Sequence, residues 1–148
     1  MFVEVVTSLR EMEQVGQAIG SGLRAGDLLL LKGDLGAGKT TLTQSIAQVL
    51  GFEGITSPTF VISKIYPGDV PLIHVDAYRF IGEPFAIFDD LDLDSRLESS
   101  ITIVEWGTGF VERLSESYLE IEINFGAGEQ SRTLSFTPHG DRWSGFVL

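Results

Sequence analysis

The sequence predicts an α/β fold, a three-layer sandwich in which helices cover both faces of a mixed β-sheet. Three observations carry this prediction. The apolar run "DLLLLK" at 27–32 is typical of a strand that is buried on both faces. A glycine-rich loop and a segment with helical spacing follow it directly. Two later pairs of strand-like runs are each joined by turn residues, so the sheet should contain antiparallel hairpins.

The first elements of the chain are a strand and a helix. "FVEVVT" at 2–7 alternates weakly between apolar and polar residues, as a strand does. Ser8 and Glu11 have the spacing of a capping box, which predicts a helix from Leu9 to about Arg24.

The loop after the buried strand opens a second helix. Apolar residues recur at helical spacing over 40–50, and Gly51 is placed to end this helix. The strand-like runs at 59–66 and 70–78 flank "PGD", which predicts the first hairpin. The remaining expected elements are an amphipathic helical stretch at 84–99, a buried strand at 101–106 and a second hairpin formed by 117–125 and 132–137.

The first strand of the second hairpin has the cleanest alternation, with four apolar residues on one face. These residues are Leu119, Ile121, Ile123 and Phe125. No repeat, linker or low-complexity segment interrupts the chain, and 148 residues are enough to bury a substantial core. We therefore expect a single domain spanning 1–148.

The charge balance limits the classes of partner. The chain has 10 basic and 21 acidic residues, which gives a net charge of −11, and its lysines and arginines are scattered. Binding to a nucleic-acid backbone relies on Lys and Arg that displace condensed counterions. Tight, direct binding of RNA or DNA is therefore not expected.

The composition also bears on location. There are no cysteines, which excludes disulfides and thiolate metal sites and favours a reducing cytoplasm. No run approaches the ~18 apolar residues that span a bilayer. The start of the chain has no basic leader, so we expect neither a membrane anchor nor secretion.

The glycine-rich loop "GDLGAGKT" at 33–40 carries the clearest chemical signal, because it completes the pattern G-x4-G-K-[ST]. Glycines let backbone N–H groups turn inward around an anion, and the helix N-terminus adds a positive dipole end. Lys39 should reach the β- and γ-phosphates of a nucleotide, and the Thr40 hydroxyl should bind Mg²⁺. The expected nucleotide-binding residues of this loop are Gly33, Asp34, Leu35, Gly36, Ala37, Gly38, Lys39, Thr40 and Thr41.

The position of this motif between a buried strand and a helix makes the predicted fold P-loop NTPase-like. A guanine-specific protein would be expected to show an Asn-Lys-x-Asp element, and the sequence has none. The sequence therefore favours ATP over GTP.

Two acidic residues end apolar strands beyond the loop: Asp76 closes "LIHVD" and Glu105 closes "ITIVE". A nucleotide hydrolase needs such a carboxylate to hold Mg²⁺ or to order water. Either acid could be a solvated strand edge, but two beside a phosphate loop favour catalysis, and with Lys39 they are the expected catalytic residues. His74 shares a strand face with Asp76 and is interpreted as a core histidine or as a support for a neighbouring group, with a direct role in the chemistry as the remaining alternative.

Four further residues each leave two interpretations open. Thr59, in "SPTF", either contacts the γ-phosphate or Mg²⁺ or merely begins a strand. Arg79 either neutralises phosphate charge or pairs with an acid, and Trp106 either belongs to the core or covers the site. Asp34 either accepts hydrogen bonds from backbone N–H groups of its own turn or lies near the γ-phosphate and orients water.

Four ordered segments, "GDLGAGKTTLTQ", "SPTF", "HVDAYR" and "IVEW", resemble the TsaE (YjeE) family of small bacterial P-loop ATPases in tRNA threonylcarbamoyladenosine biosynthesis. The resemblance runs from about Leu30 to Trp106. It implies the P-loop NTPase-like fold already predicted. It also implies TsaB- and TsaD-type partners, with tRNA reached only through them, and an ATPase that is weak alone and resets the assembly.

For individual residues, the resemblance implies that Lys39 and Thr40 serve ATP and Mg²⁺. Asp76 and Glu105 would be the working acids, with Glu105 as a Mg²⁺ ligand, and Thr59 would lie in a switch-like segment. Two other functions stay open: a small P-loop kinase with Asp76 as its base, although no arginine-bearing lid is evident, and a nucleotide-gated binding module.

Overall fold

The computed structural model describes residues 1–56, 63–77, 93–106 and 111–148. The strands are β1 (Phe2–Val6), β2 (Leu28–Gly33), β3 (Ser63–Tyr66), β4 (Leu72–Asp76), β5 (Ile101–Glu105), β6 (Tyr118–Phe125) and β7 (Arg132–His139). The helices are α1 (Leu9–Ser21), α2 (Lys39–Val49), α4 (Leu93–Arg96) and α5 (Val111–Leu114), with 3₁₀ turns η2 (Leu97–Ser99) and η3 (Asp141–Trp143).

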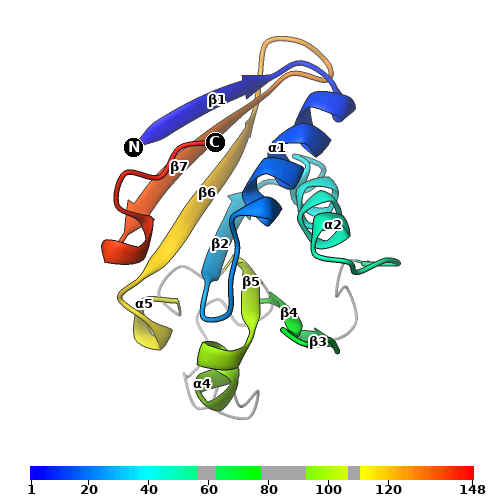
Figure 1. Cartoon of the computed structure of the whole chain (residues 1–148). Coiled ribbons are helices and arrows are strands. Elements are labelled where there is room, and N and C mark those ends of the chain that lie inside the picture. The colour runs from blue at the N-terminus through cyan, green and yellow to red at the C-terminus, as the bar shows by residue number, and fades with distance from the viewer. Residues whose placement is uncertain (57–62, 78–92, 107–110) are drawn as a thin grey trace.

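The seven strands form one sheet in the order β1-β7-β6-β2-β5-β4-β3 (Figure 1). The four central strands β6, β2, β5 and β4 run parallel to one another. The pairs β1–β7, β6–β7 and β3–β4 are antiparallel. The mixed sheet expected from the two hairpins is therefore confirmed, and the strand that precedes the glycine-rich loop lies at its centre.

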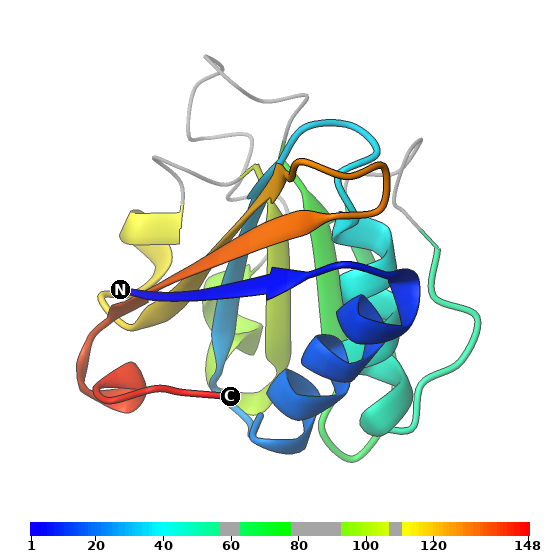
Figure 2. The same ribbon diagram turned by 90° about the horizontal axis from the view of Figure 1, so that it is seen from above.

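Helices cover both faces of the sheet, as the sequence predicted. α1 and α2 lie side by side on one face (Figures 1 and 2), where Leu29 and Leu31 of β2 join their core. On the opposite face, Leu28 and Leu30 pack in a second core with Val111 of α5. β2 is thus buried on both faces, because its apolar run supplies side chains to two separate cores.

The start of α1 follows the predicted capping box only in part. Ser8 Oγ accepts a hydrogen bond from the Glu11 N–H at 3.2 Å, as expected of an N-cap. The Glu11 carboxylate accepts from the N–H of Thr7 at 2.6 Å instead of returning to Ser8. The helix ends at Ser21, three residues before the predicted end, because the chain must turn to enter β2.

The apolar face of β6 is buried over most of its length but not at its end. Leu119, Ile121 and Ile123 of β6 are buried, but Phe125 at the end of the same face is 54% exposed. β6 and β7 extend past the core at this end, and the Arg132 guanidinium lies 4.6 Å from the centre of the Phe125 ring. The alternation therefore continues beyond the point at which the sheet has a helix to cover it.

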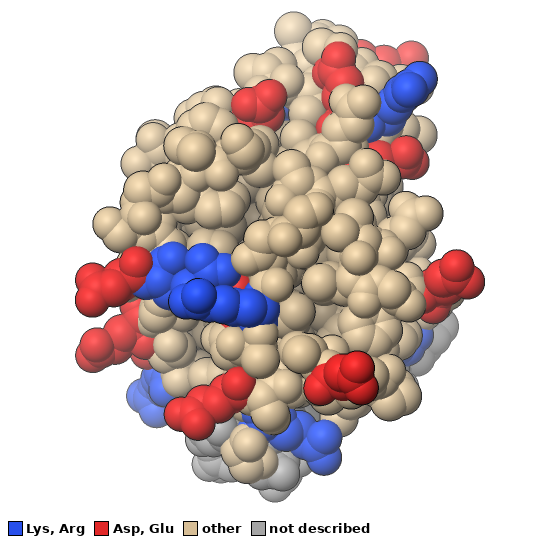
Figure 3. Space-filling view, in the orientation of Figure 1, with Lys and Arg blue, Asp and Glu red and all other residues tan. Residues whose placement is uncertain are grey.

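The surface and the helix lengths bear on the predicted partners. On the face drawn in Figure 3, Lys and Arg stand in small separate groups among acidic side chains. Among the residues that the structure describes, no helix is long and apolar enough to cross a membrane. Of the helical stretch expected at 84–99, residues 84–92 lie outside the described residues, and the rest forms α4 and η2.

Candidate functional site

The glycine-rich loop connects the central strand β2 to α2. Its turn is closed by a hydrogen bond of 3.0 Å from the Ala37 N–H to the Asp34 carbonyl oxygen. Gly38, just before the helix, has a φ of 120°, which residues with a side chain rarely adopt. Because Gly38 offers no side chain to cap α2, the first N–H groups of the helix remain available to an anion.

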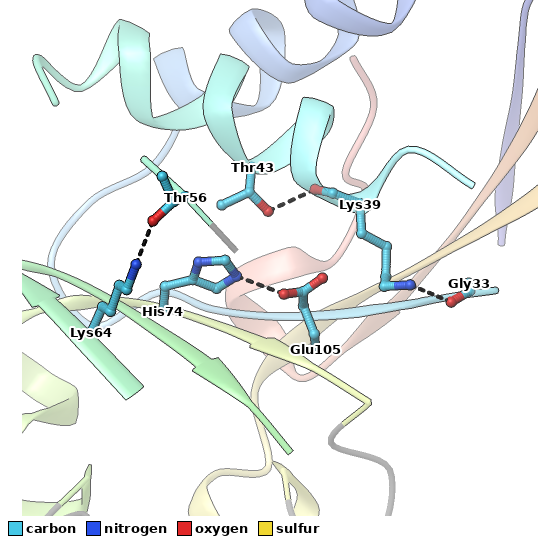
Figure 4. Close-up of polar contacts among 7 residues, drawn as sticks. All are labelled: Gly33, Lys39, Thr43, Thr56, Lys64, His74 and Glu105. Carbon is cyan, nitrogen blue, oxygen red and sulfur yellow. Dashed lines mark hydrogen bonds and ion pairs between the residues drawn. The ribbon is translucent and has the colours of Figure 1, made fainter. Parts of the chain in front are cut away.

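Lys39 is the first residue of α2, and its side chain folds back along the loop (Figure 4). Its ammonium group donates to the carbonyl oxygen of Gly33, and to that of Asp34 at 3.3 Å. The same nitrogen lies 4.8 Å from the centre of the Trp106 ring, a cation–π contact. These contacts hold a nearly buried positive charge against the loop.

The two strand-end acids meet at the edge of the sheet where the loop begins. Asp76 of β4 and Glu105 of β5 are direct partners in the parallel register. β5 in turn lies next to β2, with Leu31 opposite Glu105. Since parallel strands bring their carboxyl ends to one edge, the acids and the loop face the same crevice.

A pocket of about 280 Å³ occupies this crevice. Its lining combines the first turn of α2, one ammonium group, hydroxyl groups and two carboxylates. The lining residues are Leu35, Gly36, Gly38, Lys39, Thr40, Thr41, Asp76 and Glu105. A larger pocket of about 440 Å³ shares Thr41, but its lining, as far as the structure describes it, contains no lysine or arginine. The smaller pocket is therefore the better site for an anion.

Glu105 is held by a histidine from the neighbouring strand. His74 Nε2 and Glu105 Oε2 are 2.9 Å apart, and their side chains point toward each other (Figure 4). Both are almost completely buried, His74 at 1% exposed and Glu105 at 4%. Of the three interpretations of His74, this contact favours the one in which His74 supports a neighbouring group.

The oxygen atoms of this pocket fit Mg²⁺. Mg²⁺ is usually bound by one or two carboxylates together with phosphate oxygens and water, rather than by an all-protein cage. The Thr40 hydroxyl and the Glu105 carboxylate belong to the same pocket lining. Within the described part of the chain, no group of three or more His, Asp or Glu could hold a metal ion. A Mg²⁺ ion here would therefore depend on the phosphates of a nucleotide.

One contact to the loop had no signal in the sequence. Arg132, the first residue of β7, donates from Nε to the Ala37 carbonyl oxygen at 3.0 Å. It lies 95 residues further along the chain and reaches the loop only because the β6–β7 hairpin pairs beside β2. The contact ties the back of the glycine-rich loop to the sheet.

The comparisons with known proteins agree with this arrangement. Residues 6–134 match the family model described as threonylcarbamoyl adenosine biosynthesis protein TsaE. The chain belongs to the TsaE family. The family resemblance and the P-loop NTPase-like fold predicted from the sequence are thereby confirmed.

Individual TsaE proteins are similar over most of their length. The tRNA threonylcarbamoyladenosine biosynthesis protein TsaE of Streptomyces coelicolor is 46% identical over 140 residues, which cover 90% of this chain and 94% of the relative. The Bacillus subtilis protein of the same name is 39% identical over 136 residues, covering 90% and 83%. The crystal structure of Bacillus subtilis YdiB superposes with a TM-score of 0.78 at 33% identity, covering 97% of this chain and 88% of that one.

The remaining predicted residues of this TsaE family member lie in several places. Gly33 and Ala37 are buried behind the pocket, while Asp34 is exposed and does not line it. Within the described residues, the Asp34 carboxylate makes no hydrogen bond, and the backbone carbonyl shapes the turn instead. Thr59 and Arg79 lie outside the described residues, so their roles stay predictions.

Proposed function

We propose that this protein binds ATP with Mg²⁺ and hydrolyses it in support of threonylcarbamoylation of adenosine in tRNA. The observation that carries the proposal is the single pocket lined by the glycine-rich loop, Lys39 and both strand-end acids. Family membership gives the biological context, because the similar proteins are named for tRNA threonylcarbamoyladenosine biosynthesis.

Each part of the pocket has a role in this proposal. The N–H groups of the loop and of the first turn of α2 hold the phosphates, and the Lys39 ammonium contacts the β- and γ-phosphates. Thr40 and Glu105 hold Mg²⁺, which neutralises the phosphate charge that develops during hydrolysis. Asp76 orients the attacking water from the end of β4. Catalysis of this kind rests on positioning and electrostatics rather than on a covalent intermediate.

The partners follow from the family and the charge. TsaB- and TsaD-type proteins would carry the threonylcarbamoyl transfer, and the ATPase would reset their complex in a reducing cytoplasm. A net charge of −11 makes it unfavourable for this chain to grip a tRNA backbone directly. tRNA is therefore reached through the partners.

The test measures phosphate release from ATP by the purified protein, with and without TsaB- and TsaD-type partners. We expect slow Mg²⁺-dependent hydrolysis alone and a clear rise with both partners. Glu105→Gln should remove most of this activity while the melting temperature stays close to that of the wild type. Glu98→Gln, which makes the same charge change at an exposed residue of η2, should leave it intact.

Two results would contradict the proposal. The first is an absence of ATP binding and of stimulation by the partners. The second is transfer of the γ-phosphate to a small molecule, which would identify a kinase.

A further inference from the structure

His74 has an environment that a purely structural histidine does not require. It comes from β4, is buried between the sheet and α2, and directs Nε2 at the Glu105 carboxylate of β5 (Figure 4). Its Nδ1 is also buried and has no hydrogen-bond partner in the described part of the chain. Most buried polar atoms in proteins form a hydrogen bond, and burying one without a partner costs free energy. Another contact of the His74 ring must therefore offset the cost of burying Nδ1. Among the described residues, the contact that the ring makes is with Glu105.

The geometry fixes which nitrogen carries the proton. An ionised carboxylate only accepts hydrogen bonds, so the bond to Glu105 requires a proton on Nε2. In the tautomer with its one proton on Nε2, Nδ1 is a bare acceptor, and no N–H group of the ring is left buried without a partner. The ring is therefore a donor aimed at one oxygen of Glu105.

This bond restricts what Glu105 can offer to the pocket. With Oε2 engaged by His74, Oε1 is the oxygen left to face a bound cation. A carboxylate that is free to rotate could present either oxygen, whereas the bond to His74 restricts the rotation of this one and leaves Oε1 without that contact. Mg²⁺ demands near-ideal octahedral geometry, so a ligand fixed in this way is preorganised for it.

We propose that His74 is a positioning residue: its Nε2–H orients Glu105 so that one carboxylate oxygen binds the divalent cation of the nucleotide complex. The inference rests on the proposed function, since it assumes that a metal–nucleotide complex occupies the pocket. It adds a residue that neither touches the nucleotide nor binds the metal. Groups that orient a metal ligand in this way typically contribute about 10- to 100-fold to metal affinity.

Two amide substitutions separate a hydrogen-bond role from a packing role. The amide nitrogen in His74→Gln lies near the original Nε2 position and can still donate to Glu105. The shorter side chain in His74→Asn reaches only the Nδ1 position and cannot. Both variants bury one amide at the same site, so they are matched for the burial of a polar group and differ in how far that group reaches.

The measurement is the affinity for Mn²⁺ in the presence of ADP. Electron paramagnetic resonance detects the free and the bound Mn²⁺ during the titration. We expect His74→Asn to weaken Mn²⁺ binding about 10- to 100-fold and His74→Gln to stay near the wild type. ADP affinity in EDTA should be the same in all three proteins. Unchanged Mn²⁺ affinity in His74→Asn would overturn the inference, and so would equal losses in both variants.

A measurement on the wild type covers the case in which His74→Asn fails to fold. The chain has two histidines, so nitrogen-15 spectra of the imidazoles are readily assigned with a His139→Gln variant. We expect a proton on Nε2 of His74, and a change in the chemical shifts of its ring nitrogens when Mg²⁺ is added to the ADP-bound protein. An Nε2 without a proton would overturn the inference while leaving the proposed function standing. Failure of the wild type to bind Mn²⁺ with nucleotide would overturn both.

Discussion

Replacement of Lys39 by alanine should weaken ATP binding by one to two orders of magnitude. A unit charge about 4 Å from a phosphate at an effective dielectric constant of ~20 contributes about 4 kcal/mol. Part of this is offset, because the ammonium group must give up its bonds to the Gly33 and Asp34 carbonyl oxygens. A net loss of about 1.5–3 kcal/mol, as for other hydrogen bonds to charged groups, corresponds to a roughly 10- to 150-fold rise in Kd.

Isothermal titration of the purified protein with ATP measures this loss. Lys32→Ala is the matched control, because Lys32 lies on β2 seven residues earlier, outside the pocket lining, with its Nζ 4.0 Å from a Glu120 oxygen. It removes the same charge and should leave the affinity nearly unchanged. Equal affinity of Lys39→Ala and wild type would refute the site. If both variants lost the same ATP affinity, the loss would come from the net charge of the protein and not from a contact between Lys39 and the phosphates.

Three further predictions concern stability and its pH dependence. Arg142→Ala should cost about 2–3 kcal/mol in urea unfolding, because it strips a bidentate partner at 2.7 and 2.8 Å from the buried Asp27 carboxylate. This loss of stability is smaller than that expected when a fully buried ion pair loses one partner, because the Arg142 side chain is 26% exposed. Gly16→Ala should lower the melting temperature although alanine favours helices, because its Cβ would lie 2.5 Å from a side-chain carbon of α2. Burial, and then the Glu112 charge, raise the pKa of Tyr118, so its contribution to stability is complete below pH 10 and is lost as the pH rises further. Tyr118→Phe should therefore lose less stability than the wild type between about pH 9 and pH 11.

Each of these three predictions has a result that would contradict it. A wild-type free energy of unfolding for Arg142→Ala would mean that Asp27 finds solvent or another partner. A raised melting temperature for Gly16→Ala would mean that the two helices separate at little cost. Identical alkaline losses for the wild type and Tyr118→Phe would place the titrating group elsewhere.

The central part of the fold was predictable because its signals are local. The four consecutive leucines at 28–31 indicate a strand that is buried on both faces. The glycine pattern that follows is typical of a phosphate-binding loop. Chain order then places the strand-end acids at one edge of the sheet once the strands are parallel. These inferences needed the period of the sequence and the rules for parallel sheets, but no knowledge of register.

The contacts that refine the site depend on register and on backbone geometry, which short sequence patterns do not report. The bond between His74 and Glu105 requires β4 and β5 to be neighbours, although 31 residues separate the two side chains. Trp106 contacts Lys39 from a backbone with φ of 62°, a conformation that nothing in the sequence assigns to a tryptophan. Arg132 reaches the loop through a hairpin whose place beside β2 no local motif specifies.

The aspartate in the phosphate-binding loop is consistent with anion binding once its backbone and side chain are considered separately. Asp34 gives its carbonyl oxygen to the loop turn and to Lys39, while its carboxylate is exposed to water, where salt screens it. The acids that matter to an incoming nucleotide are Asp76 and Glu105, because they line the pocket together with Lys39. Among the described lining residues the formal charge is one positive against two negative, a net of −1. A polyphosphate would therefore meet a slightly acidic pocket, and its binding must draw on the α2 N-terminus and on a divalent cation held by the same carboxylates.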